Sequence, residues 1–217
     1  MNLIIDIGNT ATKLAVFQRD KILKTKTIGG SSLVLEVENI LLEFTEIKQG
    51  LVSSVGFLST KELDALEKRL PLTILNSGLK LPFKVHYETP NTLGSDRLAL
   101  MAAAATQYPW QNVLVIDAGS CITYDFVDSQ KNYLGGAIAP GIQMRYKSLS
   151  EFTSSLPSLQ KKIPKHPIGN TTNNSIHSGI VHGLLYEIEG TVREYQNNYS
   201  DLTVILTGGD ADFLCKQ

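Results

Sequence analysis

The stretch LIIDIGNTATKLAV at residues 3–16 decides how the chain is interpreted, because LVIDAGSCITYDFV at residues 114–127 repeats it. Aligned without a gap, the two stretches share apolar, polar and glycine positions: Leu3 with Leu114, Ile5 with Ile116, Asp6 with Asp117, Gly8 with Gly119, Thr12 with Thr123 and Val16 with Val127. Each copy is typical of an apolar strand, a tight turn at Asp-x-Gly and a second strand. The repeat therefore predicts two duplicated halves.

Apolar residues at helical spacing predict helices over residues 31–49, 59–70, 95–107, 142–152 and 172–195. Ser59 and Glu62 have the spacing of a capping box, and Gly50 is expected to end the first helix. Short apolar runs predict strands over residues 51–55, 72–75, 133–139 and 204–206. This alternation is typical of a layered α/β architecture. We expect the halves to be residues 1–112 and 113–217, with the last segment of the second half missing.

Composition and charge exclude several classes of protein. The chain has 217 residues, 42% of them hydrophobic, which is enough for a sizeable core. Twenty basic and 21 acidic residues give a net charge of −1, which argues against binding to nucleic acid or to an anionic membrane. Two cysteines, Cys121 and Cys215, form no disulfide framework, and no apolar segment is long enough for a membrane span. We expect a soluble cytoplasmic protein, and we interpret the lysine-containing segment 155–171 as a solvated connection rather than an anion site.

Several familiar catalytic signatures are absent from the sequence. It has no Walker A loop, no GxGxxG, no GxSxG and no His-Glu-x-x-His, and its four histidines lack the spacing of zinc ligands. These absences argue against a hydrolase triad and against a dinucleotide-binding fold.

The turn after residue 6 has the chemistry of a phosphate site. Asp6 ends an apolar strand and is followed by Ile7, Gly8, Asn9, Thr10, Ala11, Thr12 and Lys13. Successive N–H groups and short polar side chains in such a turn can bind phosphate oxygens, and one carboxylate is a usual ligand of Mg²⁺. An ordinary hairpin turn uses the same residue types, so this turn alone leaves both interpretations open.

Two further turns favour the phosphate interpretation. Asp117 and Gly119 repeat the first turn in the second half, and Thr207-Gly208-Gly209 adds a glycine turn at the end of another strand. Duplicated turns can face each other across a cleft and hold a polyphosphate, and strand ends are where α/β sheets bind nucleotides. These turns resemble those of the actin-like ATPase superfamily, which implies duplicated RNase-H-like domains with an ATP cleft between them.

One branch of that superfamily matches motifs along nearly the whole chain. The motifs occur in this order: Asp6 to Thr10, Tyr87 to Pro90 leading to Gly94-Ser95-Asp96-Arg97, Asp117 to Ser120, Gly135 to Gly141, and Ile168 to Thr172. Together they resemble the type III pantothenate kinases. The resemblance implies ATP-dependent phosphorylation of pantothenate, the first step of coenzyme A biosynthesis.

The resemblance also implies roles for individual residues. It implies that the turn from Asp6 to Lys13, together with Ser120, contacts ATP, which is bound with Mg²⁺. Asp117 is implied to be the ligand of a monovalent cation, K⁺ or NH₄⁺. The substrate residues implied are Tyr87, Gly94, Ser95, Asp96, Arg97 and Thr172. The chain departs from the family pattern at Ser95, where alanine is usual, and at Ser120, where threonine is usual. A homodimer is implied as well.

Asp96 has a chemically sensible role in this scheme. Phosphoryl transfer needs a carboxylate that orients the acceptor hydroxyl and takes its proton. The resemblance gives that part to Asp96, and the fork of Arg97 suits a carboxylate or a phosphate. As alternatives, Ser95 and Asp96 are ordinary helix-start residues, and Arg97 forms a surface ion pair. For the whole chain, the alternatives are another phosphotransferase or a phosphatase on the same fold, and a non-catalytic nucleotide-binding regulator.

Overall fold

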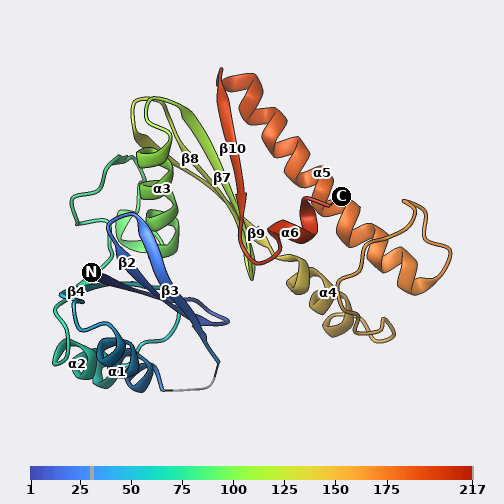
Figure 1. Ribbon diagram of the computed structural model, residues 1–217. Coiled ribbons are helices and arrows are strands. Elements are labelled where there is room, and N and C mark those ends of the chain that lie inside the picture. Colours follow the sequence, from blue (N-terminus) through green and yellow to red (C-terminus); the bar gives the residue numbers. More distant parts are fainter. Residues whose placement is uncertain (30–31, 217) are drawn as a thin grey trace. The chain divides into compact units, whose positions relative to one another are not determined.

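The computed structural model describes residues 1–29 and 32–216, which fall into two compact units (Figure 1). The first unit contains residues 1–81 and 88–100, and the second contains residues 82–87 and 101–217. Each unit is built around its own five-stranded sheet, and the boundary between the units falls within α3 (Ser95–Gln107). The α/β class predicted from the sequence is confirmed, whereas the domain bounds 1–112 and 113–217 and the binding of ATP between the halves stay predictions.

The sheet of the first unit has the strand order β3-β2-β1-β4-β5. Its elements are β1 (Asn2–Ile7), β2 (Thr12–Gln18), β3 (Lys21–Ile28), α1 (Leu33–Glu43), β4 (Gln49–Ser54), α2 (Thr60–Glu67) and β5 (Leu72–Ile74). The first three strands form an antiparallel meander, and β4 and β5 run parallel to β1. Alternate residues of β1, namely Leu3, Ile5 and Ile7, face the core shared with α1 and α2. Asp6 is therefore on the opposite face of the sheet.

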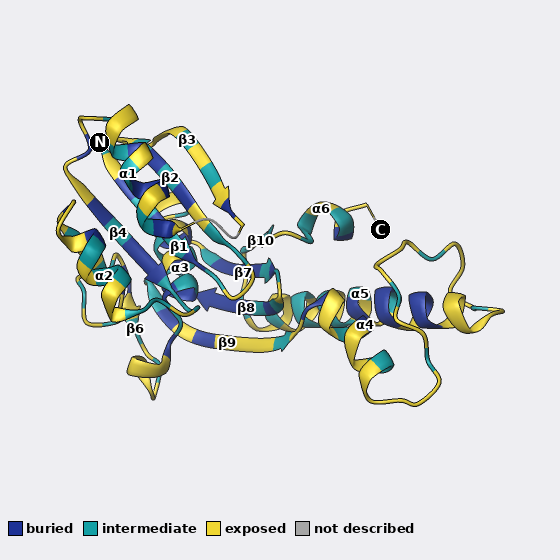
Figure 2. Ribbon diagram, turned by 90° about the horizontal axis from the view of Figure 1, so that it is seen from below, coloured by how far each residue is buried: buried dark blue, intermediate teal, exposed yellow. Residues whose placement is uncertain are grey.

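The sheet of the second unit has the strand order β10-β7-β8-β9-β6, in which β10, β7, β8 and β9 correspond to β4, β1, β2 and β3, whereas the fifth strand, β6, lies beside β9 and not beside β10. Its elements are β6 (Lys84–Val85), β7 (Asn112–Ala118), β8 (Cys121–Val127), β9 (Asn132–Pro140), α4 (Ile142–Glu151), α5 (Thr172–Asn198), β10 (Leu202–Thr207) and α6 (Ala211–Leu214). Strands β7, β8 and β9 form a meander, and β10 runs parallel to β7 as β4 does to β1. Figure 2 shows that β7 and β8 are buried along most of their length, whereas β3 of the first unit is largely exposed. The shared order supports the duplication predicted from the sequence.

The register of the strands corrects the gapless alignment of the two halves. Ile7 pairs with Thr12 across the first turn, but Ala118 pairs with Ile122 across the second, so the second turn is one residue shorter. The first strands of the two copies match as aligned. The second strands are shifted by one residue, so Thr123 occupies the position that Lys13 has in the first copy.

The helix predicted over residues 31–49 is shorter than expected. Helix α1 is Leu33–Glu43, and Ser31 lies outside the described residues. Gly50 does not end this helix: it lies in β4, where its N–H donates to the carbonyl of Pro71 at 2.9 Å. Tertiary packing explains the error, because a Cβ on Gly50 would lie 2.6 Å from the side chain of Leu72.

Other helix predictions agree closely with the structure. The capping box of Ser59 and Glu62 is present, and α3 (Ser95–Gln107) has the predicted bounds. The apolar stripe of α5 packs on its own sheet, with Ile180 and Leu184 in the core beside Tyr124 of β8. A short 3₁₀ helix, η1 (Pro90–Thr92), precedes α3. None of the described helices combines the length and the apolar character that crossing a bilayer requires.

Candidate functional site

The turn between β1 and β2 presents polar groups to solvent. It spans residues 8–11 and is closed by a hydrogen bond from the N–H of Gly8 to the carbonyl of Ala11 at 3.1 Å. Asn9 and Thr10 are exposed at its tip. Successive turn N–H groups with short polar side chains suit an anion such as phosphate.

Ile7 supports this turn from inside. Its side chain is 4% exposed and belongs to the core. Its carbonyl accepts the N–H groups of Val55 and Gly56, both at 3.0 Å, which ties the end of β4 to the turn. Ile7 therefore holds the turn in position through its backbone, and its side chain is not available to a ligand.

The carboxyl group of Asp6 lies among groups that shift its pKa in opposite directions. On β1 it is paired with Lys13 of β2 on one side and with Ser53 of β4 on the other. Burial raises the pKa of the Asp6 carboxyl above its ordinary value, Lys13 lowers it, Asp96 raises it and a hydrogen bond with Ser53 lowers it. The net effect is a raised pKa, and the interaction with Asp96 places the two carboxylates near each other within the first unit.

Asp96 lies in the first turn of α3. The carbonyl of Gly94 accepts the N–H of Leu98 at 3.2 Å, so the helix begins directly after this glycine. Oδ1 of Asp96 accepts the N–H of Arg97 at 2.8 Å, and a Cβ on Gly94 would lie 2.5 Å from the same oxygen. The carboxylate thus lies over the start of the helix, where the exposed N–H groups favour a negative charge.

The neighbours of Asp96 are buried. The hydroxyl of Ser95 lies 3.1 Å from that of Ser53 and accepts the N–H of Ser54 at 2.8 Å. Arg97 is 5% exposed. The alternative of a surface ion pair for Arg97 is therefore wrong, because its guanidinium group lies inside the protein.

Tyr87 belongs to the second unit. It follows β6, and its ring stacks on that of Tyr133 with centroids 6.2 Å apart and planes inclined by 20°. Its expected contact with the same substrate as Asp96 stays a prediction.

Asp117 has surroundings that parallel those of Asp6. On β7 it is paired with Thr123 of β8 and with Thr207 of β10. The second copy thus has a threonine where the first has Lys13, and Thr207 corresponds to Ser53. Gly208 follows with φ of +97°, and a Cβ there would lie 2.4 Å from Oδ1 of Asp117. Hydroxyl-bearing residues thus flank Asp117 on both neighbouring strands, and carboxylate and hydroxyl oxygens suit a cation better than an anion.

Ser120 is exposed in the short turn after Asp117. The N–H of Gly119 donates to the carbonyl of Cys121 at 2.9 Å, and the N–H of Gly141 donates to the carbonyl of Ser120 at 3.2 Å. The N–H of Asp210 donates to Ala118 at 2.9 Å. The turn is thus fixed by the ends of β9 and β10, which leaves the hydroxyl of Ser120 at the surface.

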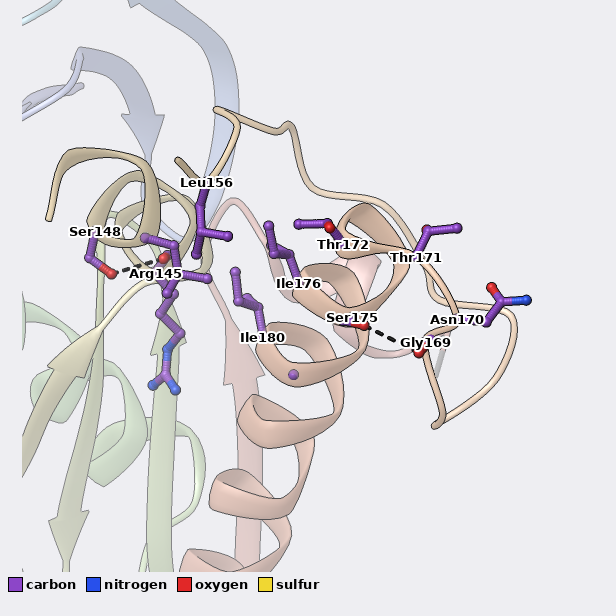
Figure 3. Close-up of a pocket in the computed structure, with 12 residues that line it drawn as sticks. Arg145, Ser148, Leu156, Gly169, Asn170, Thr171, Thr172, Ser175, Ile176 and Ile180 are labelled. Carbon is purple, nitrogen blue, oxygen red and sulfur yellow. Dashed lines mark hydrogen bonds between the residues drawn. The ribbon is translucent and has the colours of Figure 1, made fainter. Parts of the chain in front are cut away.

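Thr172 lines an open pocket of about 1070 Å³ within the second unit (Figure 3). The pocket lies between α4, α5 and the segment that connects them. Leu156, Ile176 and Ile180 point toward one another on its inner side, and Asn170, Thr171 and Thr172 form its other end (Figure 3). The side chain of Thr171 caps α5 by accepting the N–H of Asn174 at 3.2 Å. The pocket therefore offers an apolar wall and hydroxyl groups at the start of a helix.

The structure brings only some of the expected residues together. Within the first unit, the turn of residues 6–13 and the segment 94–97 lie near each other through Asp6, Ser53 and Asp96. In the second unit, Asp117 and Ser120 share one turn, whereas Thr172 begins α5. In the part of the chain that the structure describes, no cluster of three His, Cys, Asp or Glu side chains that could hold a metal ion is found.

Ser53 and Ser54 were missed by sequence reasoning. A signal was present, because Ser53 and Ser54 lie at the end of the predicted strand 51–55, directly before Gly56, much as Thr207-Gly208-Gly209 lies at the end of the predicted strand 204–206. Tyr133 and Asp125 were also missed, and no local motif identifies them.

The chain matches a family model and is similar to known proteins along most of its length. A family model described as type III pantothenate kinase matches residues 2–194. A protein of Christiangramia forsetii named type III pantothenate kinase is 46% identical over 214 residues, which cover 99% of this chain and 88% of the relative.

Solved structures share the fold. A Campylobacter jejuni protein assigned to the Baf family of transcriptional activators has a TM-score of 0.60 and 24% identity, covering 99% of this chain and 86% of the other. A Listeria monocytogenes protein assigned as an N-acetylmannosamine kinase has a TM-score of 0.56 and 15% identity, covering 99% and 86%. Identities this low concern the fold alone, which these chains share with nearly the whole of this chain.

Proposed function

Because the chain belongs to the type III pantothenate kinase family, we propose that it transfers the γ-phosphoryl group of ATP to the primary hydroxyl of pantothenate. The product, 4′-phosphopantothenate, begins the synthesis of coenzyme A. The family match over residues 2–194 carries the proposal. The proximity of Asp96 to the turn at Asp6 supports it.

Asp96 is the proposed catalytic residue. Its carboxylate orients the acceptor hydroxyl and takes its proton as the bond to phosphorus forms and the bond to the ADP oxygen breaks. The helix start and the Arg97 N–H hold the carboxylate in place. Gly94, Ser95 and Arg97 are proposed to line the pantothenate site from beneath, where the positive charge of the buried Arg97 would attract the carboxylate of pantothenate.

The turn of residues 6–13 is the proposed phosphate site. Its N–H groups and the side chains of Asn9, Thr10 and Thr12 orient the phosphates, and Lys13 adds a positive charge. Asp6 and the Ser53 hydroxyl supply oxygen ligands of the kind that Mg²⁺ prefers. The ion, when bound with ATP, offsets charge that develops on the phosphates.

Asp117 is the proposed ligand of a monovalent cation, K⁺ or NH₄⁺. The paired hydroxyl residues Thr123 and Thr207 and the space left by Gly208 support this role. Ser120 contacts ATP from the same turn.

Thr172 and Tyr87 are proposed to contact pantothenate.

The protein is proposed to work as a cytoplasmic homodimer. Exposed apolar side chains near the Thr172 pocket support self-association: Phe152 is 85% exposed and Ile168 is 84% exposed. Light scattering of the purified protein tests the assembly, and a monomeric mass would contradict it.

An ADP-release assay with and without pantothenate tests the function. We expect ADP formation that depends on pantothenate and on K⁺ rather than Na⁺. Release of inorganic phosphate without an acceptor would indicate a phosphatase, and ATP binding without turnover would indicate a regulator. ADP formation at the same rate with and without pantothenate would refute the proposal.

A further inference from the structure

The segment that ends at Tyr87 is held by strand β9. Strand β6 runs parallel to β9, with Val85 paired to Tyr133. The N–H of Lys84 donates to the carbonyl of Lys131 at 2.8 Å, and the N–H of His86 donates to the carbonyl of Tyr133 at 2.9 Å. The position of Tyr87 therefore depends on the residues of β9 beside it.

Tyr133 is the centre of the aromatic contacts in this region. Its side chain is 0% exposed. Its ring contacts Phe83 edge-on, with centroids 5.9 Å apart, and stacks on Tyr87 at 6.2 Å. Such contacts stabilise one relative orientation of two rings. The orientation of Tyr87 thus follows that of Tyr133.

A β-bulge in β9 brings the backbone at Gly135 close to the ring of Tyr87. Phe126 pairs with Gly135 and Val127 pairs with Tyr133, which leaves Leu134 as an extra residue in the register of β8 and β9. Gly135 has φ of +101°, and a Cβ there would lie 3.4 Å from two atoms of the Tyr87 ring. Bulges of this kind redirect side chains and are frequent next to active sites.

The hydroxyl of Tyr133 is fixed by a buried carboxylate. It donates to Oδ1 of Asp125 at 2.7 Å, and Asp125 is 0% exposed. A hydrogen bond is stronger in a buried setting than at the surface. Rotation of the Tyr133 ring would break this bond, so Asp125 fixes the surface on which Tyr87 stacks.

We infer that Tyr133, held by Asp125, is a positioning residue that sets the ring of Tyr87 for pantothenate. The inference rests on the proposed function, since the substrate contact of Tyr87 comes from the family resemblance. It assigns a purpose to the Gly135 bulge, which the proposed phosphoryl transfer does not otherwise use.

The variant Tyr133→Phe tests this inference, because it keeps the ring and removes only the hydroxyl. We expect the Kd of pantothenate by calorimetry and its KM to rise about 5- to 10-fold, as the loss of one oriented contact implies, while the KM of ATP changes less than about 2-fold. Tyr124→Phe is the matched control: its buried hydroxyl also donates to a carboxylate, Oε1 of Glu187, at 2.9 Å. The control is expected to lower the melting temperature similarly without changing pantothenate affinity.

Three results would overturn the inference: wild-type pantothenate affinity in Tyr133→Phe, equal losses for pantothenate and ATP, or the same loss in Tyr124→Phe. If Tyr133→Phe does not fold, Gly135→Ala gives the second test, because a side chain at φ of +101° strains the bulge while its Cβ contacts the Tyr87 ring at 3.4 Å. Unchanged pantothenate affinity in that variant is equally decisive. If the wild-type protein releases ADP at the same rate with and without pantothenate, the proposed function is refuted instead.

Discussion

The hydroxyl groups of Ser53 and Ser95 lie 3.1 Å apart in the interior of the first unit. Ser53 is on β4, next to the strand of Asp6, and Ser95 is the first residue of the helix that carries Asp96. The N–H of Ser54 also donates to the hydroxyl of Ser95 at 2.8 Å. These bonds join the strand beside β1 to the start of α3, which keeps Asp96 close enough to Asp6 to raise its pKa.

Ser95→Ala is expected to lower the free energy of unfolding by about 1–2 kcal/mol, because the Ser54 N–H and the Ser53 hydroxyl lose a buried partner. Urea unfolding measures the change. Ser150→Ala is the control: it removes an exposed hydroxyl that donates to the carbonyl of Lys147, and it should change stability by less than about 0.5 kcal/mol. Equal losses in the two variants would contradict the importance of the Ser53 link.

Asp96→Asn is expected to lower kcat by at least about 10²-fold, because an amide cannot take the proton of the acceptor hydroxyl. Its side-chain oxygen still accepts the N–H of Arg97, so the melting temperature should remain close to that of the wild type. Steady-state kinetics of ADP release measure the loss. Asp64→Asn, at an exposed position of α2, is the control and should keep wild-type turnover. Wild-type kcat in Asp96→Asn would refute the role of Asp96 as the base.

The parts of the fold that depend on local sequence were predictable. The bounds of α3 follow from residues near Ser95, and the capping box of α2 lies within four residues. The end of α1 was not predictable, because Gly50 is required by packing on Leu72, a contact between distant segments. Strand β6 is too short for any periodic pattern, since only Lys84 and Val85 form it.

The candidate site also has some residues that local sequence predicts and others that only the fold reveals. Asp6 and Asp117 were identified because a carboxylate at the end of an apolar strand is a local signal. The link between Ser53 and Ser95 joins residues 42 positions apart, so only the fold reveals it. The one-residue shift that places Thr123 where Lys13 stands also needed strand registers, because a gapless alignment hides it.

Asp6→Asn is expected to stabilise the protein at pH 7 while it abolishes phosphoryl transfer. The pKa of Asp6 is raised in the native state, so the native protein holds this proton more tightly than the unfolded chain. The resulting stability is present below the ordinary pKa of 3.8 and is lost as the pH rises through the native pKa. Ionised Asp6 therefore destabilises the protein at pH 7, and a neutral amide removes that cost.

Thermal unfolding at several pH values tests the effect. We expect Asp6→Asn to melt about 1–3 °C above the wild type at pH 7, with a smaller difference at pH 4. Asp20→Asn, at an exposed position between β2 and β3, is the control and should show no such trend. A variant that melts below the wild type at pH 7 would contradict the sign of the shift.

Asp117→Asn is expected to weaken activation by K⁺. Loss of the carboxylate that Thr123 and Thr207 flank removes the main attraction of this site for a cation, so the K⁺ concentration for half-maximal activity should rise at least about 10-fold. The KM of ATP should rise with it, because Ser120 of the same turn is the proposed ATP contact. Kinetics with K⁺ replaced stepwise by Na⁺ at constant ionic strength measure both effects.

Adjacent glycines provide a matched test of the geometry around Asp117. Gly208→Ala introduces a Cβ 2.4 Å from Oδ1 of Asp117 and strains a backbone with φ of +97°, so it should weaken K⁺ activation in the same direction. Gly209→Ala is the control, because a Cβ there meets nothing within 4 Å. If Gly208→Ala and Gly209→Ala respond to K⁺ alike, the carboxylate of Asp117 acts without the space that Gly208 provides. Unchanged K⁺ activation in Asp117→Asn itself would remove the cation site from this turn, and the parallel between Asp6 and Asp117 would then be structural only.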